Sequence, residues 1–221
     1  MAPGGLASIY GSNFTLPGLA FYGLPSADPL NPSGPLSVPT NLGGVTVSMG
    51  GRAVPLLFVS PSQINFQVPY DTPNGSANLT VTAGNTSSLP AYFGVFQTAP
   101  IILVYGDNWA VAQNQDYSVN AADNPAKVGD FITVYGTAAG AVNPAVPTGQ
   151  AAPVSPLSTV ADVTVTIRGA PAKVTFAGLT PGFVGLLQVN LQVPALPNGA
   201  YPIQISVGSY KSNPPTIAVT H

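Results

Sequence analysis

Four oxygen-bearing side chains occupy every second position in one segment of this 221-residue chain: Asn114, Asp116, Ser118 and Asn120. Alternating oxygen ligands are typical of calcium-binding loops, which a bidentate acid usually closes at the twelfth position. That position is Pro125 here. The alternative, which we favour, is an Asx-type turn in which these side chains hydrogen-bond backbone amides. We therefore predict no metal ion and no cofactor, and keep these four residues as the calcium candidates.

A second polar pattern, Gln-x-Asn-x-Gln, occurs twice in the chain. Its members are Gln63, Asn65 and Gln67 and, 125 positions later, Gln188, Asn190 and Gln192. In a β-strand the three amides of each copy share one face, and the apolar residues between them share the other. The amides either face water and neighbouring loops, or present hydrogen-bonding groups to a protein or sugar partner. We expect the amides to be more exposed than the apolar residues between them, and all six are candidate interface residues.

Aromatic side chains could add stacking surfaces for a sugar, because the chain has nine tyrosines and nine phenylalanines. Several of the phenylalanines, however, occur within strand-like patterns. We expect four of them in the hydrophobic core: Phe14, Phe58, Phe66 and Phe176.

Residues suited to catalysis are scarce. The one histidine, His221, is the last residue, and the chain contains no cysteine and no glutamate. Ser-His-Asp and Cys-His arrangements require an internal histidine, so neither can form. A pair of aspartates remains the one acid–base alternative. We therefore predict that the protein is not an enzyme.

An internal duplication indicates which structural units position the polar patterns. Ile9-Tyr10-Gly11 recurs as Val134-Tyr135-Gly136, 125 positions later, at the same offset as the amide pattern. Asn74-Gly75 recurs as Asn198-Gly199, 124 positions later. Ordered matches at a nearly constant offset indicate two copies of one structural unit.

Each copy reads as short β-strands separated by turns. Val45 to Met49 and Val163 to Ile167 alternate apolar and polar residues, which is typical of a sheet with one buried face. The 25 prolines and 24 glycines leave no uninterrupted amphipathic helix. We predict an all-β protein of two tandem immunoglobulin-like β-sandwich domains, 1–99 and 128–221. Residues 100–127 should form an ordered connector, with Trp109 packed at the junction.

The composition excludes several classes of partner. Charged residues make up 5% of the chain and the net charge is −2, whereas ordinary soluble proteins are about 25% charged. The five basic residues are scattered, so the basic stripe that nucleic-acid binding needs is missing. No apolar run approaches the roughly 18 residues of a membrane span. We expect no nucleic-acid partner and no membrane insertion.

Several segments resemble known families. GGLASIYGSNF (4–14), SQINFQVP (62–69) and NGSANLTVTAGN (74–85) are similar to the IPT/TIG immunoglobulin-like fold. NQDYSVNAADNPAKVGD (114–130) and AGLTPGFVGLLQVNLQVP (177–194) resemble a Solibacter-type C-terminal domain family of acidobacterial secreted or surface proteins. Tyr117 departs from that family's pattern, which has glycine in an Asp-Gly turn. The resemblance implies the fold, and it implies no biochemical activity.

These observations together predict a non-catalytic structural or adhesive module at a bacterial cell surface or outside the cell. A surface with few charges favours self-association, because little electrostatic repulsion keeps copies apart. We expect the partner to be another copy or a surface protein, with assembly into a filament or array as one outcome. The alternative is a carbohydrate-binding accessory module of a secreted enzyme, with a polysaccharide as partner.

Overall fold

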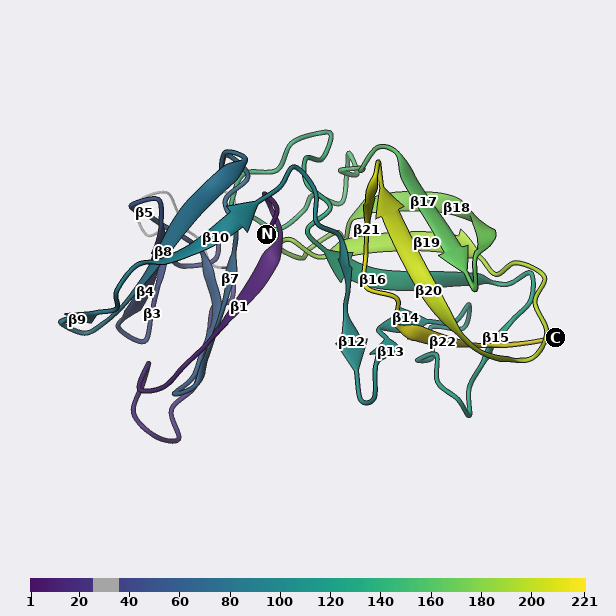
Figure 1. Ribbon diagram of the computed structural model, residues 1–221, viewed down its shortest axis with the longest axis horizontal. Helices are drawn as coiled ribbons and strands as arrows, with labels where there is room; N and C mark the ends of the chain where they lie inside the picture. Colours follow the sequence, from purple (N-terminus) through teal and green to yellow (C-terminus); the bar gives the residue numbers. More distant parts are fainter. Residues whose placement is uncertain (26–35) are drawn as a thin grey trace.

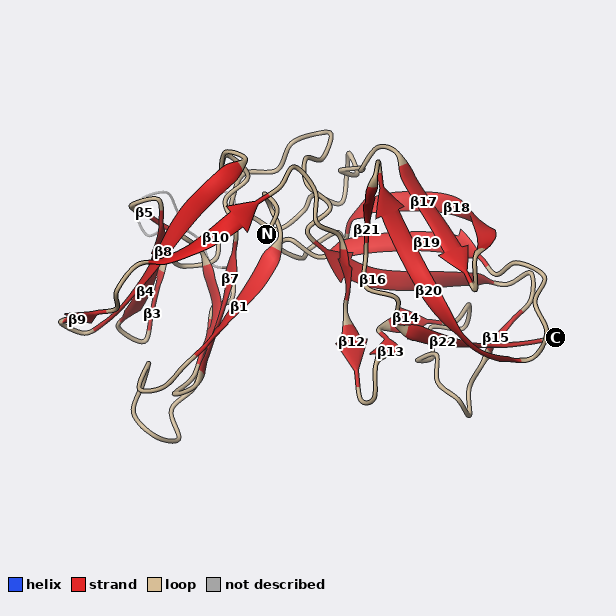
Figure 2. Cartoon of the chain, viewed as in Figure 1, coloured by secondary structure: helices blue, strands red, loops and turns tan. Residues whose placement is uncertain are grey.

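The computed structural model describes residues 1–25 and 36–221. Every regular element in these ranges is a β-strand, which confirms the predicted all-β class (Figure 2). The same ranges contain no helix of the length and hydrophobicity needed to cross a membrane. Figure 1 shows two groups of strands side by side, with the N-terminus at their junction and the C-terminus at the far end of the second group.

The first half of the chain forms two sheets. Its strands are β1 (Leu6–Tyr10), β2 (Phe21–Tyr22), β3 (Asn41–Leu42), β4 (Val45–Met49), β5 (Arg52–Ala53), β6 (Leu56–Val59), β7 (Gln63–Gln67), β8 (Gly75–Ala83), β9 (Thr86–Ser87) and β10 (Ala91–Val95). One sheet has the order β1–β7–β6–β2 and the other β10–β8–β4–β3, with β5 and β9 at its edges. One hydrophobic core contains residues from both sheets, as in a β-sandwich.

The second half forms a single, more continuous sheet. Its strands are β11 (Ile101–Ile102), β12 (Val104–Tyr105), β13 (Trp109–Ala110), β14 (Ala112–Gln113), β15 (Ala126–Lys127), β16 (Phe131–Thr137), β17 (Val163–Ile167), β18 (Ala170–Leu179), β19 (Leu187–Gln192), β20 (Gly199–Val207), β21 (Tyr210–Lys211) and β22 (Thr216–Thr220). The main path runs β11–β16–β19–β18–β17–β20–β22–β13–β12. This half has a hydrophobic core of its own.

The segment predicted as a connector contributes strands to the second half. β11 and β14 pair with β16, while β13 and β15 pair with β22. Trp109 therefore lies opposite Thr216 of β22. Its strand β13 lies between β22 and the edge strand β12, so the backbone of Trp109 belongs to the sheet of the second half.

Strand pairing repeats between the halves as the duplication predicts. In the β1–β7 pair, Tyr10 lies opposite Gln63. In the β16–β19 pair, Tyr135 lies opposite Gln188, which is the same register 125 positions later. The β4–β8 and β17–β20 pairs also correspond, at offsets of 118 and 124 residues: Val45 lies opposite Ala83, and Val163 lies opposite Val207.

The apolar face of the repeated strand is buried in both halves. Ile64, Phe66 and Val68 are at most 1% exposed, and Val189, Leu191 and Val193 are at most 2% exposed. The predicted register of β7 and β19 is thereby confirmed. These six side chains belong to the two separate cores.

The expectation of four core phenylalanines holds only in part. Phe66 is fully buried and Phe14 packs against the core. Phe58 and Phe176, by contrast, lie opposite Asn65 and Asn190, on the amide face. A β-bulge precedes each of them and shifts the strand by one residue, which turns the side chain to the other face.

Candidate functional site

The two halves are locked together by the side chain of Gln67. Its Nε2 atom donates to the carbonyl oxygen of Gly4 at 3.2 Å, and its Oε1 atom accepts the amide of Gly149, from the second half, at 2.7 Å. The side chain is 0% exposed. The expectation that all the amides are more exposed than their apolar neighbours is wrong for Gln67, because the second half covers this end of β7.

Thr137 makes a second polar connection beside Gln67. Its Oγ1 atom accepts the amide of Leu6 at 2.7 Å and donates to the carbonyl oxygen of Gly185 at 3.0 Å. A Cβ atom at Gly185 would lie 2.8 Å from the Gly4 carbonyl oxygen, so the close approach requires glycine there. We call the contact made by Gly4, Leu6 and Gln67 with Thr137, Gly149 and Gly185 the junction.

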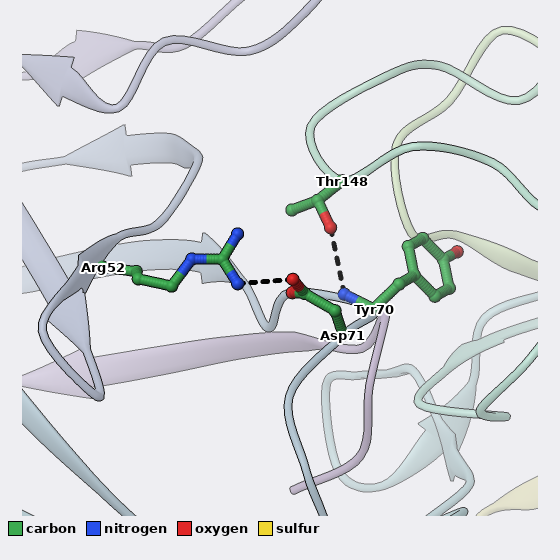
Figure 3. A network of polar contacts seen from close by, with 4 residues as sticks. All are labelled: Arg52, Tyr70, Asp71 and Thr148. Carbon is green, nitrogen blue, oxygen red and sulfur yellow. Dashed lines mark hydrogen bonds and ion pairs between the residues drawn. The ribbon is translucent and has the colours of Figure 1, made fainter.

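Tyr70 extends the junction with an apolar contact. Its ring packs on the small cluster of Val146, Ala152 and Leu179. Its backbone amide donates to Thr148 Oγ1 at 3.0 Å, as Figure 3 shows. Burial raises the pKa of the phenol to about 12. The group is therefore neutral at any ordinary pH, and no buried charge crosses the junction at this point.

The one ion pair between described residues lies at the rim of this region. Arg52 pairs with Asp71, next to Tyr70 in the chain (Figure 3). The hydrogen bond from Arg52 lowers the pKa of the Asp71 carboxyl. Both side chains are more than half exposed, so the pair adds little to stability.

Four of the five remaining amides form matching hydrogen-bonded pairs on the two halves. Gln63 Nε2 donates to Asn65 Oδ1 at 2.7 Å, and Gln188 Nε2 donates to Asn190 Oδ1 at 3.0 Å. A hydroxyl from the neighbouring strand, Ser8 or Thr133, donates to the same Oδ1 atom. These four amides are half-buried. Within the described residues, this bonding leaves the asparagine Nδ2 and the glutamine Oε1 of each pair able to bond a further group.

Exposed aromatic rings flank the amides of the first half. Tyr10 of β1 is 75% exposed and Tyr22 of β2 is 70% exposed. Tyr22 packs on Phe58 with ring centroids 5.2 Å apart and tilted by 55°. We call this surface of the β1–β7–β6–β2 sheet the outer face; it consists of Ser8, Tyr10, Tyr22, Phe58, Gln63 and Asn65. Sequence reasoning missed Tyr22, because its strand has only two residues.

A groove of about 540 Å³ adjoins the outer face, between the two halves. Leu6, Ser8 and Asn65 line it from the first half, and Ile101 and Leu103 line it from the second. The groove is mostly apolar, with hydroxyl and amide groups at intervals.

The calcium candidates are bonded to one another and to the backbone. Asp116 Oδ1 accepts hydrogen bonds from the hydroxyl of Ser118 and from its amide, and these bonds, the hydroxyl's first, lower the pKa of the carboxyl. Asn120 is buried; it donates to Asn114 Oδ1 at 3.0 Å and exchanges bonds of 2.9 and 2.8 Å with the backbone of Ala218. The bond between Asp116 and Ser118 is that of an Asx-type turn, whereas Asn120 fastens this segment to β22.

Tyr117 adopts the glycine conformation that its place in the turn requires. Its φ angle is +66° and its side chain is 81% exposed. Glycine would adopt this left-handed conformation with less strain. Among the described residues no group of three His, Cys, Asp or Glu side chains is placed to hold a metal ion.

An IPT/TIG domain is found at residues 2–96, which lie in the first half. No curated protein matches the chain in sequence. Among solved structures, the chain is similar to SGBP-B of the mixed-linkage glucan utilization locus of Bacteroides ovatus, determined with a mixed-linkage heptasaccharide. The identity is 12% and the TM-score 0.41, over 100% of this chain and 43% of that one.

Two further solved structures show similarity at the same level. SGBP-B from a xyloglucan utilization locus of Bacteroides uniformis has 14% identity and a TM-score of 0.32, over 96% of this chain and 44% of that one. Domains 5-6 of the S-layer protein SbsC have 15% identity and a TM-score of 0.29, over 99% and 91% of the chains. The chain spans less than half the length of either Bacteroides protein. We base the functional proposal on the residues of this chain.

Proposed function

We propose that this chain is a rigid, non-catalytic module of a bacterial cell-surface or secreted protein, which assembles with copies of itself or with a surface partner. The observation that carries the proposal is the junction. Gln67 and Thr137 join the two halves through buried, uncharged hydrogen bonds. Two halves held in this way act as one spacer with a constant shape. The resemblance to Solibacter-type surface proteins is part of the proposal.

The composition of the surface supports assembly. The chain has five basic and seven acidic residues, so most of its surface meets a second copy without desolvating ions. Desolvating an ion that is poorly paired costs several kcal/mol. Exposed apolar side chains such as Leu89 (89%) and Tyr92 (73%), near and on the edge strand β10, add area that contact with a partner would bury.

Assembly should appear as a mass that rises with protein concentration. We expect light scattering to give 22.3 kDa at low concentration and multiples of this mass at high concentration. Because the chain carries only five basic and seven acidic residues, few ion pairs can cross the contact, and added salt should weaken the multimers little. A single mass of 22.3 kDa over the whole concentration range, with no assemblies in images of the native material, would exclude self-assembly.

The outer face favours a second candidate function, binding of a neutral polysaccharide. Exposed rings provide surfaces on which sugars stack, and half-buried amides provide donors and acceptors for hydroxyl groups. Tyr10 and Tyr22 lie on the two edge strands of the sheet, with Gln63 and Asn65 between them. No charged residue is among the six that form this face, which matches an uncharged ligand.

Removing the two rings tests this candidate. The Tyr10→Ala, Tyr22→Ala double variant should bind a neutral polysaccharide roughly thirtyfold more weakly, since two stacked rings at about 1 kcal/mol each contribute about 2 kcal/mol. Affinity electrophoresis against soluble β-glucans and xyloglucan measures the change. Tyr92→Ala is the matched control, because this ring is equally exposed on the other sheet. Equal retardation of all three proteins would exclude the outer face as a sugar site.

A further inference from the structure

The far end of the second half repeats the end of the first half that forms the junction. Gly4, Leu6 and Gln67 correspond, 125 positions later, to Gly129, Phe131 and Gln192. We call the region around the latter three residues the free end. It lies on the side of the second half away from the junction, near the C-terminus (Figure 1).

Within each half, the hydrogen bonds between the glutamine side chain, the glycine and the neighbouring valine are the same at the two ends. Gln192 Nε2 donates to the Gly129 carbonyl oxygen at 2.8 Å, as Gln67 Nε2 does to Gly4. Both glycines have positive φ angles, +90° and +74°. Gly129 also donates its amide to Val193 at 3.0 Å, as Gly4 does to Val68 at 2.9 Å.

The ends differ in what covers them. Gln67 is fully buried, and its Oε1 atom accepts the Gly149 amide from the other half. Gln192 is half-buried, and within the described residues its Oε1 atom has no hydrogen-bond partner. Phe131, which corresponds to the junction residue Leu6, is 45% exposed. The free end thus has the geometry of the junction without the covering half.

The first half carries a counterpart of Thr137 at its own outer end. Thr137, whose hydroxyl binds the Leu6 amide in the junction, corresponds to Ser12. The next residues, Ala138 and Asn13, have nearly equal positive φ angles of +63° and +62°. Ser12 is exposed, in the loop that follows β1 at the lower left of Figure 1.

From these correspondences we infer that copies of this chain dock head to tail, with the Ser12 end of one copy against the free end of the next. The occupant of the free end is a second copy, because the internal junction shows how such an end is covered. A heterologous contact of this kind repeats without closing and produces an open array. The inference rests on the proposed function of self-assembly and names the surface that would mediate it.

Two charged side chains indicate that this contact is reversible. Asp130 and Lys173 stand at the free end where the junction has Gly5 and Pro55. Because charged groups keep this surface soluble when it is open, the contact should form at high concentration and dissociate on dilution.

Cysteine crosslinking tests the orientation, and the chain has no native cysteine to interfere. The double variant Ser12→Cys, Phe131→Cys should give a ladder of disulfide-linked multimers on mild oxidation. The substituted positions correspond to Thr137 and Leu6, which touch in the junction. Ser12→Cys, Val154→Cys is the control. It should give no ladder, because Val154 is 78% exposed in the loop that follows the junction residue Gly149, away from the free end.

Each result separates the inference from the proposed function. A ladder specific to the Ser12→Cys, Phe131→Cys variant supports head-to-tail docking. If the wild-type protein forms multimers by light scattering but this variant gives no ladder, head-to-tail docking is overturned and self-assembly stands. If the wild-type protein is monomeric at all concentrations, both are overturned.

Discussion

Replacing Gln67 with leucine should uncouple the two halves of the protein. The substitution puts an apolar side chain of similar size in place of the amide. It leaves the Gly149 amide and the Gly4 carbonyl without their hydrogen-bond partner. Each buried polar group left unpaired costs about 1–3 kcal/mol. We therefore expect the free energy of unfolding to fall by about 2–6 kcal/mol, as measured by urea denaturation.

The corresponding glutamine of the second half provides the matched control. Gln192→Leu removes one bond, to the Gly129 carbonyl, from a side chain that solvent reaches. Water can replace that bond, so the cost should stay below about 1 kcal/mol. If Gln67→Leu and Gln192→Leu proved equally mild, the junction would not depend on the buried amide.

Calorimetry reports the coupling directly. The wild-type halves, locked at the junction, should unfold in one cooperative transition, whereas the Gln67→Leu variant should show two. Proteolysis provides a second measure, because a loosened junction exposes the backbone of the loop that contains Gly149. Cleavage of this loop at the wild-type rate would contradict the expected loosening.

Truncating Phe66 to alanine should have the largest effect within a single core. The side chain is 0% exposed in the core that both sheets of the first half share. Truncating a buried phenylalanine to alanine costs about 3–5 kcal/mol. The cost is the sum of the lost free energy of burying the ring and the free energy of the cavity that is left. Urea denaturation of the variant measures this loss.

Leu191 is the counterpart of Phe66 in the second core, and its truncation tests the second half separately from the first. Leu191→Ala should cost about 2–5 kcal/mol and destabilise the second half first. The exposed ring of Tyr92 serves as the surface control, with an expected change within about 0.5 kcal/mol. A loss below about 1 kcal/mol for Phe66→Ala would contradict its role in the core.

The duplication and the buried faces of the strands could be predicted from the sequence, because both are local properties. An offset of 125 residues is visible in the order of residues alone. Alternation along Ile64, Phe66 and Val68 determines which face of β7 is apolar, and an apolar face must find a core. The Asx-type hydrogen bonds around Asp116 likewise depend on neighbours in the chain.

Only the tertiary structure decided which repeated residues remain accessible. Gln67 and Gln192 lie in nearly identical sequences, and they differ because the second half covers one end and not the other. Phe58 reached the outer face through a β-bulge, which an alternating pattern does not reveal. Burial at a contact between distant segments depends on the arrangement of both partners in space, and a pattern within one strand carries no information about that arrangement.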